Sequence, residues 1–278
     1  MSVTSDTSGK KRTSRSVLVP RFEGERFSGL LGACVVSVAA GQLYMLAFPP
    51  YEMWFLLPAA IGLILYSSYT RHWSGALLTG TLAGTSAFLP LFSWANIYAG
   101  TGPWVALAVF QALYIAAFSI SARLIFVRHG ISVSSSLGVS FLWAAIELAR
   151  STVPWGGLPW GVSAFAYSTS PLLNFGPWIG TVGLAVITGF LATHVFSGVM
   201  SVLWRRKRGR NGLTAVWPSA VIVAVILAAF VVPRPHAEVP TDRQRLSVAA
   251  VQGNVKPPPP GSYYLPKEMF ANHAAATR

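Results

Sequence analysis

The sequence predicts an all-α, polytopic membrane bundle of about seven transmembrane helices, followed by the first strand and helix of an α/β domain. The chain is 53% hydrophobic and only 10% charged, with a mean hydropathy of +0.52, whereas about 25% of the residues of a soluble domain are charged. Long apolar runs alternate with short polar or basic segments until residue 233, after which the composition becomes polar and rich in proline. An ordinary soluble domain is therefore excluded.

The N-terminal segment differs from the rest of the chain. Residues 1–26 are rich in Ser, Thr, Lys and Arg, so we expect a disordered cytoplasmic tail. The apolar run that follows is long enough to cross a bilayer and too long for a typical signal-peptide core. It contains Cys34, the only cysteine, in an LGAC sequence similar to a lipobox. Because the apolar stretch before it is at the short limit for a processed signal, we expect Cys34 to pack between helices.

The predicted transmembrane domain covers residues 27–233. Pro49-Pro50 ends its first helix, since a proline disfavours helical geometry in the residue before it. The seven apolar runs extend over residues 27–48, 53–69, 77–95, 104–127, 137–149, 179–204 and 215–232.

The distribution of charge predicts the orientation. Lys and Arg occur in the tail and in the loops at 70–74, 128–136 and 205–213, whereas the loops at 49–52, 96–103 and 151–177 contain neither. Cytoplasmic loops carry the excess of Lys and Arg, so the tail is predicted to be cytoplasmic and the segment after residue 233 extracytoplasmic. The net charge of +13 is divided among these clusters without a continuous basic face, which argues against a nucleic-acid partner.

The segment 151–177 connects the fifth and sixth predicted helices and is called the connection below. It interleaves aromatic residues with Pro and Gly, a composition typical of the level where lipid headgroups meet water. Just before it, Trp143, Glu147 and Arg150 are spaced at i, i+4 and i+7, so they share one helix face. The candidate lipid-side residues of this region are Glu147, Arg150, Trp155, Trp160 and Tyr167.

Each candidate has an alternative interpretation. Glu147 and Arg150 either orient a lipid headgroup or form a structural ion pair at a helix end. Trp155 and Trp160 either line a lipid entrance or anchor the chain at the interface. His194 has no carboxylate or second ligand nearby in the sequence, so a hydrogen bond to a neighbouring helix is favoured over a metal or relay role, and no metal site is predicted.

The segment after residue 233 begins a different kind of structure. Residues 234–244 are predicted to be a linker, 246–255 a buried strand, and 267–277 an Ala-rich helix. Gln252 and Asn254 lie at the strand end, where they serve either a functional loop or turn packing. One strand and one helix cannot form a domain, so we expect residues 245–278 to begin an incomplete extracytoplasmic domain of a longer protein.

Several motifs occur in an order that resembles the apolipoprotein N-acyltransferase family. They are the Trp143, Glu147 and Arg150 spacing, GLPW at 157–160, PL at 171–172, GP at 176–177, LAFPPYEMW at 46–54 and VQGNV at 251–255. The sequence AFAY at 164–167 departs from the GYSQ that the family often has there.

The resemblance implies a bacterial inner-membrane enzyme with eight membrane helices and a nitrilase-like α/β/β/α domain inserted between the last two. Its implied reaction is phospholipid-dependent N-acylation of the diacylglyceryl-cysteine of an apolipoprotein, without a cofactor. A cysteine forms the acyl thioester, a glutamate acts as general base and a lysine stabilises the oxyanion.

The resemblance also implies that all three catalytic residues lie beyond Arg278, so this chain alone is expected to be inactive. The alternative function is that of a non-catalytic transporter or membrane scaffold. A transporter would be expected to show discontinuous helices in two related halves and paired charges at mid-membrane, and the sequence indicates neither.

Overall fold

The computed structural model describes residues 27–69, 71–207, 216–233, 250–251 and 266–277. All seven predicted apolar runs are helical, and the predicted helix near the C-terminus is confirmed. The elements are α1 (Phe27–Leu46), α2 (Leu56–Tyr69), α3 (Trp73–Leu91), α4 (Ser93–Ala99), α5 (Thr101–His129), α6 (Val133–Thr152), α7 (Ser163–Ala166), the 3-10 helix η1 (Pro171–Phe175), α8 (Gly176–Lys207), α9 (Val216–Val231) and α10 (Pro266–Thr277).

Fewer helices reach membrane-spanning length than the seven apolar runs of the sequence would predict. Within the described ranges, three segments are long and apolar enough to cross a bilayer: Gly29–Leu46, Thr101–His129 and Pro171–Leu203. The bent pair α3 and α4 would make a fourth. α2 has 14 residues and so a length of about 21 Å, short of the ~30 Å hydrocarbon core. The structure thus supports a membrane protein, and the count of seven crossings stays a prediction.

Small residues let the helices of the bundle approach closely. A Cβ added to Gly84 of α3 would lie 2.6 Å from the Cα of Ala112 in α5, and one added to Gly41 of α1 would lie 2.3 Å from the carbonyl of Ala83 in α3. Such contacts allow van der Waals packing where lipid tails provide no hydrophobic driving force between helices. The close packing of α1 on α3, and of α3 on α5, therefore depends on small residues at these positions.

The predicted third helix, 77–95, is interrupted. α3 ends at Leu91, and α4 continues at an angle of 63°. Pro90 cannot donate a backbone hydrogen bond to the carbonyl of Ser86, one turn earlier. The side-chain amide of Gln42 in α1 donates to that carbonyl instead, at 2.8 Å, and to the Ser86 hydroxyl at 2.9 Å.

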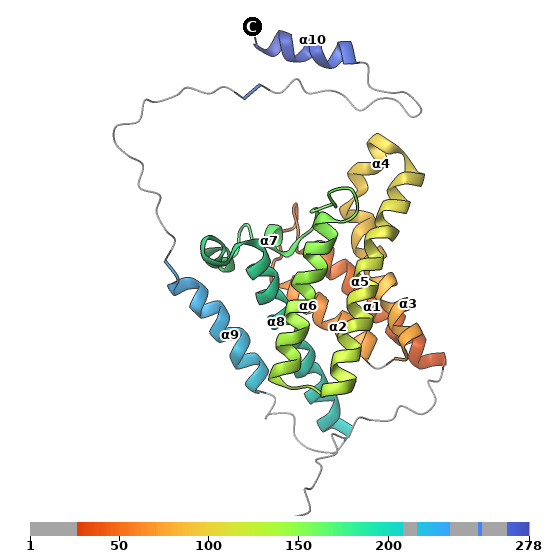
Figure 1. Ribbon diagram of the computed structural model, residues 1–278, viewed down its shortest axis with the longest axis vertical. Coiled ribbons are helices and arrows are strands. Elements are labelled where there is room, and N and C mark those ends of the chain that lie inside the picture. Colours follow the sequence, from red (N-terminus) through yellow and green to blue (C-terminus); the bar gives the residue numbers. More distant parts are fainter. Residues whose placement is uncertain (1–26, 70, 208–215, 234–249, 252–265, 278) are drawn as a thin grey trace, which may run out of the picture.

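The two ends of the bundle differ in composition. α4 and the connection lie at one end, whereas the turn between α5 and α6 and the end of α8 lie at the other (Figure 1). Arg128 lies in the last turn of α5, at the second end, and Arg123 lies five residues before it. Arg123 Nε donates to the carbonyl of Arg71, so Arg71 belongs to the second end as well. The basic and aromatic loops that the sequence separates are thus also separated in space.

Several predictions concern residues outside the described ranges. These are the tail at 1–26, the linker at 234–244 and most of the strand at 246–255. Residues 250 and 251 have no regular secondary structure, and no strand occurs within the described part of the chain.

Candidate functional site

The connection folds back tightly onto the end of α6. Leu158 N donates to the carbonyl of Arg150 at 2.9 Å, and Gly157 N donates to that of Pro154 at 2.8 Å. Gly157 has φ +71°, and a Cβ there would lie 2.2 Å from the carbonyl carbon of Ser151. Only glycine allows the backbone at position 157 to come this close to Ser151. The tight turn that results directs the following backbone toward the bundle interior.

Arg150 binds the returning backbone. Its side chain is only 1% exposed, and Nη1 donates to the carbonyls of Trp160 at 2.7 Å and Leu158 at 3.4 Å, while Nη2 donates to that of Gly161 at 3.0 Å. Nη1 also lies 3.5 Å from Oε1 of Gln111. The guanidinium therefore holds the connection in place with a rigid fork of donors.

Glu147 binds the next part of the connection. Its side chain is 5% exposed, and Oε1 accepts hydrogen bonds from both the backbone N–H and the hydroxyl of Ser163, each at 2.8 Å. The hydroxyl of Ser163 in turn accepts from Nε1 of Trp143 at 3.1 Å. Trp143, Glu147 and Arg150 share one face of α6, as predicted, and that face meets the connection. Apart from the 3.5 Å contact of Arg150 with Gln111, the side-chain hydrogen bonds of Glu147 and Arg150 go to the connection rather than to each other.

Two further tyrosines complete this anchoring. Tyr44 of α1 donates its hydroxyl to the carbonyl of Gly161 at 2.8 Å. Tyr167, a predicted lipid-side residue, is fully buried, and its hydroxyl lies 2.9 Å from that of Thr188 in α8. Tyr44 and Thr188 are not predicted from the sequence, because they lie on helices remote from the connection in sequence. A buried tyrosine hydroxyl needs a partner, and this is the signal that could have singled out Tyr44.

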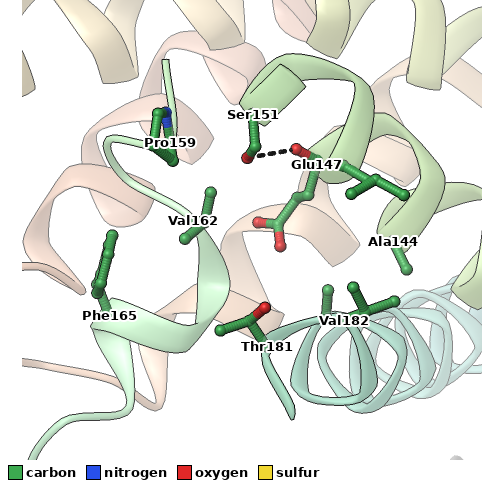
Figure 2. A pocket seen from close by; sticks show the side chains of 10 residues that line it. Ala144, Glu147, Ser151, Pro159, Val162, Phe165, Thr181 and Val182 are labelled. Atoms are coloured by element: carbon green, nitrogen blue, oxygen red, sulfur yellow. Dashed lines mark hydrogen bonds between the residues drawn. The ribbon is translucent and has the colours of Figure 1, made fainter. Parts of the chain in front are cut away.

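A pocket of about 170 Å³ lies between α6, the connection and the start of α8. Among the described residues that line it, Glu147 is the only charged one, and its carboxylate points into the pocket toward Val162 and Thr181 (Figure 2). The hydroxyl of Ser151 donates to the backbone carbonyl of Glu147 at 2.7 Å. The lining residues are Ala144, Glu147, Leu148, Ser151, Pro159, Val162, Phe165, Thr181, Val182 and Ala185.

The predicted tryptophans lie on the outside of the connection. Trp155 is completely exposed, and Trp160 is half exposed with its ring 5.6 Å from that of Trp94 in α4. Phe165, at the pocket, is also half exposed. Exposed rings at one end of an apolar bundle are typical of a membrane–water interface.

The remaining candidates are not part of this site. His194 Nδ1 lies 2.8 Å from the carbonyl of Phe190 in its own helix, so the predicted hydrogen bond to a neighbouring helix is wrong. Cys34 is half-buried in α1, and Gln252 and Asn254 lie outside the described residues. No group of three His, Cys, Asp or Glu side chains suited to a metal ion occurs in the described ranges.

Comparison with known proteins identifies similar sequences. The family model of the apolipoprotein N-acyltransferase N-terminal domain matches residues 40–194. An apolipoprotein N-acyltransferase of Photobacterium profundum is 28% identical over 86% of this chain and 45% of its own length. The protein of that name from Mycolicibacterium smegmatis is 33% identical over 84% of this chain and 41% of its own length. The chain thus spans less than half the length of these relatives.

Proposed function

Because the chain belongs to the apolipoprotein N-acyltransferase family, we propose that it supplies the membrane part of an enzyme that transfers a fatty acyl chain from a phospholipid to the N-terminal diacylglyceryl-cysteine of lipoproteins. The observation that carries this proposal is the match over residues 40–194, which includes the whole connection and its partners on α1, α6 and α8. The anchored connection is therefore the part of this chain that we assign to the lipid substrates.

The proposed setting is the bacterial inner membrane, crossed seven times by this chain, with the N-terminus in the cytoplasm. Two features support the orientation. Arg71, Arg123 and Arg128 gather at one end of the bundle, and the exposed rings of Trp155 and Trp160 lie at the other. A basic end facing the cytoplasm places the connection at the outer surface.

In this reading the connection is a rigid platform at the outer membrane surface. Arg150, Glu147 and Tyr44 hold its backbone from within the bundle, so its outward residues keep fixed positions without relying on contacts with lipid. A fixed platform of this kind suits a reaction in which a lipid tail and an amine must meet in a defined geometry.

We place the nucleophile, the general base and the oxyanion-stabilising lysine outside residues 1–278. Cys34 is the only cysteine of the chain. It precedes Tyr44 by ten residues of α1, which corresponds to about 15 Å along the helix axis below the level of the connection. A thiol at that depth does not meet the proposed substrates at the outer surface.

The test compares two proteins under one assay. The full open reading frame and the 278-residue span are each purified and supplied with phospholipid and a synthetic diacylglyceryl lipopeptide. We expect the lipopeptide to gain the mass of one acyl chain with the longer protein only. Acylation by the 278-residue span would overturn the placement of the catalytic residues, and failure of both proteins to acylate would overturn the proposed activity.

A further inference from the structure

The helix α9 lies at the side of the bundle, where it packs on α8 and η1 (Figure 1). Its outward side chains are exposed, among them Val223, Leu227, Phe230 and Val231. Ala229, in its last turn, is fully buried. The contact around Ala229 therefore decides where this end of the helix lies.

Pro233 leaves the carbonyl of Ala229 without its usual donor. A residue at position 233 of a continuing helix would donate its backbone N–H to the carbonyl four residues earlier, but proline has no N–H. Val232 N, one residue before, still donates to the carbonyl of Ala228 at 3.1 Å. A buried carbonyl without a donor is costly, so the last turn of α9 needs a donor from outside the helix.

Two side chains from the end of the connection and the start of α8 supply donors to this end of α9. Asn174 Nδ2 donates to the carbonyl of Ala229 at 2.8 Å. Trp178 Nε1 donates to the carbonyl of Pro233 at 3.1 Å. The two side chains, called the latch below, thus bind the last residues of α9 through hydrogen bonds, which are directional, whereas apolar contacts are not.

The end of α3 contains the same kind of arrangement. There Pro90 lacks the N–H that would reach the carbonyl of Ser86, and the side-chain amide of Gln42 donates to that carbonyl from α1. In both places an amide side chain from another segment replaces the N–H that a proline lacks. The recurrence favours a specific role for the Asn174 amide over an incidental surface contact.

The latch stands on a short segment that is separated from the main body of α8. Gly180 has φ +65° and ψ −171°, which breaks the helix after its first turn. A Cβ at this position would meet nothing within 4 Å, so the backbone conformation, not lack of space, favours glycine. Trp178 lies three residues before Thr181, which lines the pocket described above. The point where the chain leaves α9 is therefore close to that pocket.

We propose that Asn174 and Trp178 are positioning residues, which fix the end of α9 against the connection and so set the point and direction from which the chain continues after Pro233. The inference rests on the proposed function, which assigns the catalytic residues to a later part of the protein. The latch keeps the start of that later part in register with the pocket and the connection.

The first test measures the position of the end of α9 in the whole 278-residue chain. Spin labels are attached to Val153→Cys in the connection and Val231→Cys in α9, two exposed positions, in a Cys34→Ser background. Double electron–electron resonance then gives the distribution of distances between the labels. We expect one narrow distribution with the latch intact, and a broader one in Asn174→Ala.

Hydrogen exchange measures the size of the effect, and a second substitution shows its cause. The amides of residues 230–232 should exchange roughly fivefold faster in Asn174→Ala, the factor expected for the loss of one hydrogen bond. Pro233→Ala supplies an N–H to the carbonyl of Ala229. In the double variant Asn174→Ala/Pro233→Ala, the exchange rate and the label distances should therefore return toward those of the wild type.

The indole donor is tested in the same way. Trp178→Phe keeps an aromatic ring and removes the N–H, so it should broaden the label distances near Pro233. Trp73→Phe is the matched control, because Trp73 is an exposed tryptophan at the start of α3. It should leave the end of α9 as in the wild type.

Two results would overturn the latch. One is an Asn174→Ala variant with the wild-type distances and exchange rates, and the other is a broadening that Pro233→Ala does not reverse, since that would show that Asn174 acts by packing alone.

A separate arm measures acylation of the lipopeptide by the longer protein. Asn174→Ala should lower kcat severalfold and leave KM for the lipopeptide unchanged, because a displaced end of α9 changes the alignment of the reacting groups. A wild-type kcat in this variant would overturn the positioning role. Absence of acylation by the wild-type longer protein would overturn the proposed function instead, since the label and exchange measurements need no acyl transfer.

Discussion

Replacing Arg150 by methionine would keep the length of the side chain and remove its charge and all its donors. The two short hydrogen bonds, to Trp160 at 2.7 Å and Gly161 at 3.0 Å, would be lost together with the stacking on Phe88. Hydrogen bonds between membrane helices contribute ~0.6–1.7 kcal/mol each, and a cation–π contact about 1 kcal/mol. We therefore expect a loss of about 3 kcal/mol of unfolding free energy.

Two measurements test this expectation. The midpoint of thermal unfolding of the purified protein in detergent should fall by roughly 6–12 °C, taking ~2–4 °C per kcal/mol for a chain of this size. Chymotrypsin should also cut faster at the exposed Trp155 and Trp160, because the connection loses its anchor to α6. The same cleavage should not accelerate at the opposite end of the bundle.

Arg128→Met is the matched control, because Arg128 is an exposed arginine in the last turn of α5. An exposed substitution of this kind should change the free energy of unfolding by no more than ~0.5 kcal/mol. If Arg150→Met unfolded at the wild-type temperature and its connection were cut at the wild-type rate, the anchoring role assigned to Arg150 would be refuted.

Three further predictions concern other parts of the bundle. Tyr44→Phe should cost about 1 kcal/mol of unfolding free energy in thermal melts, by losing one buried hydrogen bond, whereas the exposed Tyr51→Phe should cost nothing measurable. Gly84→Ala should destabilise the protein because its Cβ meets the α5 backbone, while Gly138→Ala, with open space around it, should be neutral or raise stability by ~0.5–1 kcal/mol in the same melts. A reporter fused after Ser136 should react as cytoplasmic, and an extracytoplasmic reaction would contradict the proposed orientation.

The helices were predictable because their signal is local. Each of the seven apolar runs is helical, the third of them as the bent pair α3 and α4, since an apolar run in lipid satisfies its backbone polar groups only as a helix. The break at Phe92 was missed although Pro90 marks it in the sequence. Apolar composition alone fixes neither where a helix bends nor whether a 14-residue helix such as α2 crosses the whole bilayer.

The site was predictable in part. The spacing of Trp143, Glu147 and Arg150 correctly placed them on one face, because helical periodicity is a property of the sequence itself. Their partners were not predictable: Arg150 binds backbone carbonyls, which every residue possesses, so nothing in the sequence marks those of Trp160 and Gly161. The pocket depends on how α8 approaches α6, and that distance has no local signature.

Pro90 and Gln42 lie far apart in the chain, yet the structure makes one depend on the other. Because the proline leaves the carbonyl of Ser86 without its usual donor within the helix, the amide of Gln42 serves as a substitute from the neighbouring helix. A relative with an ordinary residue in place of the proline would no longer need that amide. The two sites should consequently change in concert over evolutionary time, and loss of the amide should be harmful in the wild type yet harmless in a Pro90→Ala background.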